Sequence, residues 1–275
     1  WFPASYRESY PAPSAVADLD LLQAAASGKS FGIRLAREAG QPPHRFDIRL
    51  FHPVEPIALS DILPPTENLG LRVLSEVPFK LNEGGKVVSL QVLTVETADG
   101  SAVDLDEAAP RLARTAKRLW FGALENDGFN RLVLRAGLEW RQIALVRAYA
   151  KYLRQAGIPF SQDYMERALA AYPAIARGVV ELFTARFDPA LGDATTGPRP
   201  KRVGEIEATL GEALDKVTTL DEDRILRRFV NAVQCTLRSN YCQEKPWISF
   251  KLDSRKLDEL PAPRPLVEVF VYSPR

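Results

Sequence analysis

The spacing of hydrophobic residues changes once along this chain, near Asp104, and that change limits the folds that the chain can adopt. Between about Phe31 and Thr97, apolar and polar residues alternate, which is the pattern of a β-strand with one buried face. From Asp104 to Tyr241, apolar residues recur every three or four positions, as in an amphipathic helix. The sequence therefore predicts an α+β unit followed by a mainly helical region, with no internal repeat.

The first region predicts a small unit in which strands and helices follow one another. Alternating residues at 31–35 and 46–50 predict two strands, each with one face buried. A short helix is expected over 60–70, and further strands over 71–77 and 87–97. With the helix that follows, this is the order of a ferredoxin-like βαββαβ unit without a clear final strand.

The start of that short helix holds the candidate binding residues. Ser60 is a candidate N-cap, and the negative charge of Asp61 is favoured near the positive end of the helix dipole. Free amides at a helix start can also receive a carboxylate, so Ser60 and Asp61 are candidate effector-binding residues beside the loop 52–60. An ordinary helix cap is the competing interpretation of the same two residues.

Prolines and glycines set further limits on this unit. Pro64 and Pro65 lack an N–H group and fall inside the expected helix, which makes its geometry irregular. Gly70 is placed to end the helix in the left-handed conformation. Gly84 and Gly85 permit positive φ and predict a hairpin turn between the last two strands.

The second region predicts six helices, at 104–118, 140–153, 161–171, 173–186, 203–216 and 220–240. Ser161 and Pro173 suit the first positions of the third and fourth helix. A mobile loop is predicted at 188–200. Two strands, at 248–252 and 266–272, close the chain, and the second is apolar enough to predict burial on both sides.

Charge and composition exclude several classes of function. Lys and Arg number 36 and Asp and Glu number 35, so no basic surface for nucleic acid or for an anionic membrane is predicted. No apolar run approaches the ~20 residues of a membrane-spanning helix. Cys235 and Cys242 are about two helical turns apart, too far for a disulfide, so a soluble protein of a reducing cytoplasm is expected.

The residue patterns of an active site or a cofactor site are absent from the sequence. Neither Gly-x-Gly-x-x-Gly nor Gly-x-x-x-x-Gly-Lys-Ser/Thr occurs, so no dinucleotide or nucleotide loop is predicted. His44 and His52 have no cysteine or carboxylate at the spacing of a zinc site. Cys235 lies beside an apolar helix face, where a thiol is usually inert. We therefore predict no catalytic, cofactor-binding or metal-binding residue in this chain.

Two polar clusters allow both a functional and a structural interpretation. Residues 125–131 are dense in polar side chains, but Asp127 can cap the following helix while Phe129 packs inward. The other cluster is a set of four arginines, Arg224, Arg227, Arg228 and Arg238. Acidic residues at 221–223 lie within a turn of several of them, which favours a solvated, ion-paired face. The structural interpretation is preferred for both clusters.

Six strings of residues, in their order and spacing, resemble the large bacterial NAD-specific glutamate dehydrogenases. They are ENDGFNRLVL at 125–134, RAYAKYLRQ at 147–155, LDEDRILRRF at 220–229, SFKLD at 249–253, LPAPRP at 260–265 and VFVYSPR at 269–275. The resemblance covers about residues 45–275. It implies that the whole protein deaminates L-glutamate oxidatively to 2-oxoglutarate and ammonium, with NAD as hydride acceptor.

The same resemblance implies how the chain is organised. In this family, ACT-like modules and then helical motifs precede the catalytic domain, and residues 31–121 match the last such module in outline. The family's glycine- and lysine-rich substrate motif and its nucleotide-binding domain are expected beyond residue 275. No family catalytic residue can therefore be assigned to a position of this chain.

We expect an internal segment of a longer protein, since the chain opens at Trp1 without an initiator Met. The expected parts are a tail of a preceding region (1–28), an ACT-like, ferredoxin-like α/β sandwich unit (29–103), a helical domain (104–245) and strands leading into the catalytic domain (246–275).

The leading hypothesis is a non-catalytic regulatory or scaffolding segment of a NAD-dependent glutamate dehydrogenase. Its partners are then the remainder of the parent chain and the homo-oligomer, with NAD bound elsewhere in the parent. The alternative is an ACT-type module that senses an amino-acid effector at Ser60 and Asp61 and controls that enzyme. No motif supports an independent enzyme.

Overall fold

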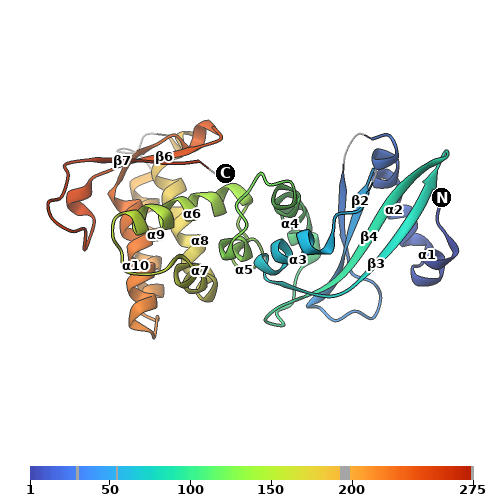
Figure 1. Cartoon of the computed structure of the whole chain (residues 1–275). Coiled ribbons are helices and arrows are strands. Elements are labelled where there is room, and N and C mark those ends of the chain that lie inside the picture. Colours follow the sequence, from blue (N-terminus) through green and yellow to red (C-terminus); the bar gives the residue numbers. More distant parts are fainter. Residues whose placement is uncertain (29–30, 54, 193–198, 274–275) are drawn as a thin grey trace. The chain divides into compact units, whose positions relative to one another are not determined.

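A four-stranded antiparallel sheet forms the centre of the first of two units, Trp1–Gly122, and helices with a three-stranded sheet form the second, Ala123–Arg275. The computed structural model describes residues 1–28, 31–53, 55–192 and 199–273. Figure 1 shows the helices and strands in chain order. The predicted α+β class is confirmed, whereas the predicted domain boundaries after residues 28, 103 and 245 stay predictions.

The sheet of the first unit has the strand order β1-β2-β4-β3, and every neighbouring pair is antiparallel. Its strands are β1 (Gly32–Ala36), β2 (Arg45–His52), β3 (Leu71–Glu83) and β4 (Lys86–Thr97). Helix α3 (Leu59–Asn68) joins β2 to β3, and α4 (Leu105–Trp120) follows β4. From β2 onward this is the β-α-β-β-α order of a ferredoxin-like unit. Strand β1 takes the edge position beside β2 that the final strand of such a unit would occupy.

Helices cover both faces of this sheet. Helices α3 and α4 contact each other and pack on β3 and β1, while α1 (Ala4–Ser9) and α2 (Ala12–Ala26) lie on the opposite face (Figure 1). Every residue of β2 except Arg45 is buried as a result. The prediction of a strand with one buried face was wrong here, because the spacing within β2 carries no sign that residues 4–26 cover its other face.

An apolar layer joins α1 and α2 to the sheet. Tyr6 and Leu22 of the helices pack with Phe51, Phe79 and Leu90 of the strands, and all five side chains are buried. The edge of the Phe79 ring faces the Tyr6 ring, with 5.4 Å between the centroids. This burial of large apolar side chains fixes the helices on the sheet.

A buried ionic cluster crosses the same layer. The guanidinium of Arg49 is fully buried, and it donates to Asp18 Oδ2 at 2.7 Å and to Glu38 Oε1 at 2.6 Å. Asp18 also accepts from the Tyr6 hydroxyl at 2.7 Å and from Arg34 Nε. Burial, reinforced by Asp18, raises the pKa of Tyr6, so its hydroxyl keeps the proton that it donates. The cluster therefore ties both helices to β1 and β2 by charge-assisted hydrogen bonds.

Strand β3 is longer than the predicted 71–77, because it continues through Pro78 to Glu83. A proline is tolerated there since β3 is an edge strand, which needs ladder hydrogen bonds on one side only. Gly84 and Gly85 have φ of +56° and +82°, as a two-residue hairpin turn requires. The predicted hairpin between β3 and β4 is confirmed.

All but the first of the helices of the second unit agree in order with the predicted ranges, and the first, which is four residues long, is not among those ranges. The helices are α5 (Leu132–Arg135), α6 (Trp140–Gln155), α7 (Gln162–Ala171), α8 (Pro173–Phe187), α9 (Arg199–Leu214) and α10 (Leu220–Cys235). Ser161 caps α7 by accepting from the Tyr164 amide at 3.2 Å, and Pro173 opens α8, both as predicted. Residues 143–150 of α6 are all buried, so this helix lies at the centre of the unit. The predicted loop at 188–200 falls partly on 193–198, outside the described residues.

The last helix ends earlier than predicted. Helix α10 was expected to reach Asn240, but it stops at Cys235, and strand β5 (Thr236–Ser239) begins at once. The Thr236 hydroxyl is shared between the Ala232 carbonyl and the Tyr149 hydroxyl, which holds Thr236 in an extended conformation beside α6. A tertiary contact therefore ends a helix that the spacing of apolar residues would continue.

The closing sheet contains β5, β6 (Ile248–Leu252) and β7 (Glu268–Tyr272) in that order. The two predicted strands are confirmed, but the prediction that the last is buried on both sides was wrong. Val269 and Val271 are 71% and 58% exposed, whereas Tyr272 is buried. Only one face of β7 is covered within the described residues, since side chains alternate across a strand.

Helices α8 and α9 approach closely at Gly178, and this contact generates the first prediction. A Cβ at Gly178 would lie 2.6 Å from Leu210 Cδ2, and Leu210 is buried. Gly178→Ala should therefore destabilise the chain by about 1–3 kcal/mol, the usual effect of overpacking a core. Urea denaturation followed by circular dichroism measures the change.

Gly204 of α9 is the matched control, since a Cβ there meets no atom within 4 Å and the position is exposed. Gly204→Ala should raise the free energy of unfolding by about 0.5–1 kcal/mol through helix propensity alone. Equal shifts of the same sign in both variants would contradict the close packing of α8 on α9.

Candidate functional site

The two residues that the sequence singled out lie on the first turn of α3. Ser60 and Asp61 are both exposed, and the Ser60 hydroxyl is 3.4 Å from Asp61 Oδ1. The N-cap residue is Ala58, whose side chain makes no cap hydrogen bond, so the assignment of Ser60 as N-cap was wrong. Asp61 does lie in the first turn, as predicted. An effector-binding role for the two residues stays a prediction.

The double proline changes what this turn can bind. Helix α3 runs through Pro64 and Pro65 without a break, although neither residue can donate to the carbonyl one turn earlier. The carbonyl oxygens of Ser60 and Asp61 therefore lack their usual helical donors. These oxygens and the Asp61 carboxylate offset the positive end of the helix dipole, which weakens this turn as a site for a carboxylate.

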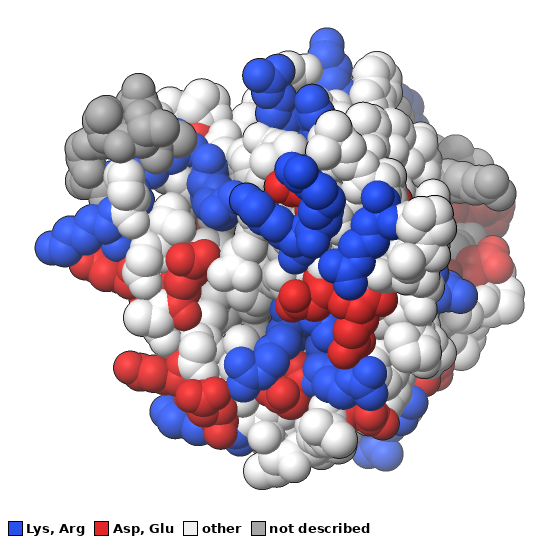
Figure 2. Space-filling model, turned by 90° about the vertical axis from the view of Figure 1, so that its left-hand side faces the viewer, with Lys and Arg blue, Asp and Glu red and all other residues white. Residues whose placement is uncertain are grey.

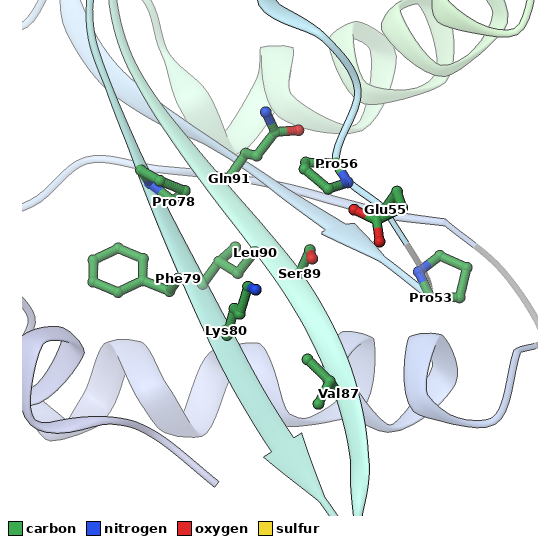
Figure 3. A pocket seen from close by; sticks show the side chains of 10 residues that line it. All are labelled: Pro53, Glu55, Pro56, Pro78, Phe79, Lys80, Val87, Ser89, Leu90 and Gln91. Atoms are coloured by element: carbon green, nitrogen blue, oxygen red, sulfur yellow. The ribbon is translucent and has the colours of Figure 1, made fainter.

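A pocket of about 610 Å³ lies beside the loop that joins β2 to α3 (Figure 3). The loop supplies two prolines and Glu55, β3 supplies Pro78 and Lys80, and β4 supplies Ser89 and Gln91. This volume is within the range of pockets that hold small molecules. The loop predicted from the sequence thus borders a pocket, but Ser60 and Asp61 are not among its lining residues.

Strand pairing brings the polar residues of the pocket together. Lys80 is opposite Ser89, and Pro78 is opposite Gln91, so these side chains share one face of the β3–β4 ladder. The intervening Leu90 points to the other face, into the layer beneath α2. The alternation of a strand therefore places polar groups in the pocket and apolar groups in the core.

Gln91 fixes the loop to the sheet. Its Oε1 accepts from the Ile57 amide at 3.1 Å, and its Nε2 donates to the Ile57 carbonyl at 3.0 Å. The same Nε2 also donates to Glu76 Oε1 at 3.0 Å. A side chain that satisfies both backbone groups of one loop residue pre-organises the wall of the pocket.

Two opposite charges face the pocket. Figure 3 shows Glu55 on the loop side and Lys80 on the strand side, with Ser89 between them. Neither charge forms an ion pair with another side chain of the described residues. A carboxylate and an ammonium on opposite walls can bind the ammonium and carboxylate groups of a zwitterion.

His52 lies next to this pocket but does not supply a charge at neutral pH. It is buried on β2, opposite Ser89, and its ring packs against Phe31 with 4.8 Å between centroids. Burial lowers the pKa of His52 to about 4, and a hydrogen bond with Gln91 offsets only part of that shift. No group of three or more His, Cys, Asp or Glu side chains within the described ranges could hold a metal ion.

The polar cluster at 125–131 in the second unit is internal structure. Arg147 of α6 is fully buried and donates to both oxygens of Asp127, at 2.6 and 2.8 Å, and to Asn130 Oδ1 at 2.8 Å. Burial opposes the charge of Arg147, but Asp127 outweighs it and raises the pKa. Asp127 also accepts from the Phe129 amide at 3.1 Å, and Phe129 is buried. The structural interpretation of this cluster is confirmed.

The arginines of α10 mostly belong to an ion-paired surface, as predicted. Arg227 pairs with Asp215 and Asp223, and Arg228 pairs with the two acidic residues Asp258 and Glu259. Figure 2 shows acidic and basic side chains interleaved over the lower part of the face that it presents. Exposed pairs of this kind contribute little to stability and carry no net field for a nucleic acid.

Cysteine and membrane features add no further site. Cys235 and Cys242 are both free, and burial raises the pKa of Cys235 to about 11, so its thiol stays protonated. No single described helix is long and apolar enough to cross a membrane. Helices α7 and α8 together have the length and apolar composition of a membrane span, but the angle between them is 99°.

Four family models match successive parts of the chain. Residues 2–25 match glutamate dehydrogenase, helical motif 2, and residues 30–108 match the ACT3 domain of glutamate dehydrogenase. Residues 124–189 match glutamate dehydrogenase, helical motif 3. Residues 209–275 match the catalytic domain of bacterial NAD-glutamate dehydrogenase, a match that takes in α10 as well as the closing strands.

Curated relatives are similar to this chain over 79–100% of its length. The NAD-specific glutamate dehydrogenases of Halomonas elongata and Pseudomonas aeruginosa are 38% and 40% identical over 100% of this chain. That of Mycobacterium tuberculosis is 41% identical over 79% of it. The chain spans 17% of the length of the first two relatives and 14% of the third.

Glu166, which lies beside the 125–131 cluster, generates a pH prediction. It is buried, accepts from the Gly128 amide at 3.1 Å and from Gln162 at 2.8 Å, and burial raises its pKa. An acid whose folded pKa lies above its unfolded value of about 4.3 loses stability as the pH rises from there through the folded pKa. Glu166→Gln should remove this loss while keeping one acceptor oxygen.

Thermal denaturation between pH 4 and pH 8 tests the prediction. The melting temperature of the Glu166→Gln variant should change less with pH than that of the unmodified chain. Glu205→Gln, at a position 64% exposed on α9, is the control and should leave the pH dependence unchanged. An unchanged pH dependence in the Glu166→Gln variant would show that the carboxyl of Glu166 titrates normally.

Proposed function

The chain belongs to the bacterial NAD-specific glutamate dehydrogenase family, and from that premise we propose that it is a non-catalytic scaffolding and regulatory segment of such an enzyme. The whole enzyme converts L-glutamate, NAD and water to 2-oxoglutarate, ammonium and NADH under this proposal. It binds NAD in a part of the protein outside this chain and works as a homo-oligomer in the cytoplasm. The segment's partners are then the remainder of the parent chain and the other subunits.

The shared core of α6 and the closing sheet is the observation that carries this proposal. Tyr149 of α6 stacks on Phe250 of β6, with 4.2 Å between centroids and 7° between ring planes. The helix lies in the part that matches helical motif 3, and the strand lies in the part that matches the catalytic domain. One face of this catalytic-domain sheet is thus built on a non-catalytic helix.

Hydrogen bonds also join α6 to the last strand of the closing sheet, β7. Tyr152 of α6 donates to Glu268 Oε2 at 2.7 Å, and Ser254 donates to the same oxygen at 2.8 Å. Burial and the hydrogen bond with Glu268 raise the pKa of Tyr152, so the hydroxyl stays protonated as a donor. A shift of α6 would therefore move the start of β7 with it. These contacts support a scaffolding role for the helices.

Removal of the Tyr152 hydroxyl tests the scaffold in the whole enzyme. Tyr152→Phe deletes one hydrogen bond to a carboxylate and should lower the stability of this chain by about 1.5–3 kcal/mol. If the sheet positions the active site, the same change should lower kcat several-fold without changing assembly. Tyr164→Phe is the control, since the Tyr164 hydroxyl makes no hydrogen bond within the described residues. Lost stability with an unchanged kcat would contradict scaffolding of the active site.

Amino-acid sensing by the first unit is a second candidate function, and the pocket with Glu55 and Lys80 favours it. The pocket borders the loop predicted to bind an effector and presents both charges that a zwitterion needs. Ser60 and Asp61 on α3 are the competing site proposed from the sequence.

A thermal-shift screen of this chain against the common amino acids separates these possibilities. A ligand at 100 times its Kd should stabilise the fold by about 2.7 kcal/mol. A shift that is lost in Lys80→Met and Glu55→Gln but kept in Ser60→Ala and Asp61→Asn assigns the effector to the pocket. The opposite result assigns it to the start of α3. The absence of a shift with every amino acid contradicts sensing by this unit.

A further inference from the structure

We propose that a separate pocket, in the unit Ala123–Arg275, binds a small anion through the guanidinium groups of Arg186 and Arg199. This pocket of about 400 Å³ is lined by the end of α8, the start of α9 and the start of β5. Its remaining walls are mainly apolar and include Phe187, Val203 and Leu237. The proposal does not depend on the function proposed above.

Arg199 is buried and forms no ion pair with an acidic side chain of the residues that the structure describes. Its side chain is 7% exposed, and its Nε donates to the Ala185 carbonyl at 2.7 Å. Its Nη1 donates to the Gly192 carbonyl. These two acceptors hold the guanidinium in place but carry no net charge, so they do not neutralise the positive charge of Arg199.

Arg186 is held in the same way from the other side. Its Nη2 donates to the carbonyls of Gln234 and Thr236, at 3.0 and 3.3 Å, where α10 ends and β5 begins. Its Nε is buried and has no hydrogen-bond partner. Backbone acceptors thus fix the position of Arg186 and leave part of its hydrogen-bonding capacity unused.

The other buried arginines within the described residues, Arg49 and Arg147, each form an ion pair with at least one carboxylate. No ion pair joins Arg186 or Arg199 to a carboxylate of the residues that the structure describes. Two cations that line one partly enclosed pocket repel each other, and an anion between them would remove that repulsion.

The geometry also limits the class of anion. A guanidinium presents a planar fork of N–H groups that matches a phosphate or a carboxylate, and each of the two held guanidinium groups keeps N–H groups that the backbone carbonyls do not use. The apolar walls and the volume favour a small organic acid or a phosphate compound over a bulky polyanion. The shared chemistry is therefore one phosphate or carboxylate group with little other charge.

The position of the pocket gives the anion a structural effect. Arg186 belongs to the part that matches helical motif 3, while Leu237 belongs to the part that matches the catalytic domain. Arg199 lies between the two matched segments. An anion that contacts both arginines would hold α8 and α9 against β5, and so would stabilise the junction between the two segments.

Binding of inorganic phosphate and of acetate to the 275-residue chain tests the proposal. Isothermal titration calorimetry and thermal shift are run against sodium chloride at matched ionic strength. One of the two anions should bind with a single site, which also shows whether a phosphate or a carboxylate is preferred. In Arg199→Lys the charge remains but the fork is lost, and the Kd should rise at least about ten-fold.

A second variant guards against misfolding of the arginine variant. Leu237→Trp leaves both arginines intact and fills the pocket from a position 47% exposed, so it should abolish binding without lowering stability. Arg202→Gln, an exposed position on α9 outside the pocket, is the control and should bind like the unmodified chain. Equal responses to sodium chloride, or equal binding in all variants, would overturn the proposal.

Discussion

A fully buried guanidinium must be neutralised where it lies, and each unit of this protein is arranged around one such group. In the first unit Arg49 reaches Asp18 and Glu38, which draws α2 and the segment after β1 onto the sheet. In the second unit Arg147 reaches Asp127, which draws the segment before α6 against that helix. Removal of one partner from such a pair typically costs about 3–5 kcal/mol, because the other charge stays buried. These ion pairs therefore favour the arrangement of the apolar layers in which each guanidinium meets its carboxylates.

The same constraint separates structural from candidate binding arginines. Arg147 has a carboxylate on two of its nitrogens, and its pKa is raised by that partner after burial has opposed the charge. Arg186 and Arg199 donate to neutral carbonyls instead and form no ion pair within the described ranges, so these contacts fix their positions without neutralising their charges. Charged groups that are held in place without an ion-pair partner are typical of a pre-organised ligand site, because binding then costs little further side-chain entropy. The partners of an arginine thus say more about its role than its exposure does.

Local sequence signals were sufficient where local contacts decide the structure. Ser161 caps α7 through the Tyr164 amide, and the Gly84-Gly85 turn closes the hairpin, as the residue types predict. Local sequence signals failed where contacts with distant segments decide the structure. The alternation within β2 did not reveal a second buried face, which residues 4–26 create from across the sheet. Likewise, α10 ends at Cys235 because Thr236 contacts Tyr149, a residue far from α10 in the sequence.

The candidate site could likewise be predicted in part, where local sequence patterns decide the structure, but not where distant contacts do. The loop at 52–60 could be singled out because strand and helix patterns enclose it, and it does border a pocket. The residues that line the pocket could not be predicted in this way. Lys80 and Ser89 have the pattern of ordinary outward positions on two strands, and only the β3–β4 register places them opposite each other. Ser60 has the residue type of an N-cap, but α3 begins at Leu59 and its N-cap is Ala58. A pocket made by side chains from three segments depends on pairing and turn geometry together, and neither can be obtained from residue type alone.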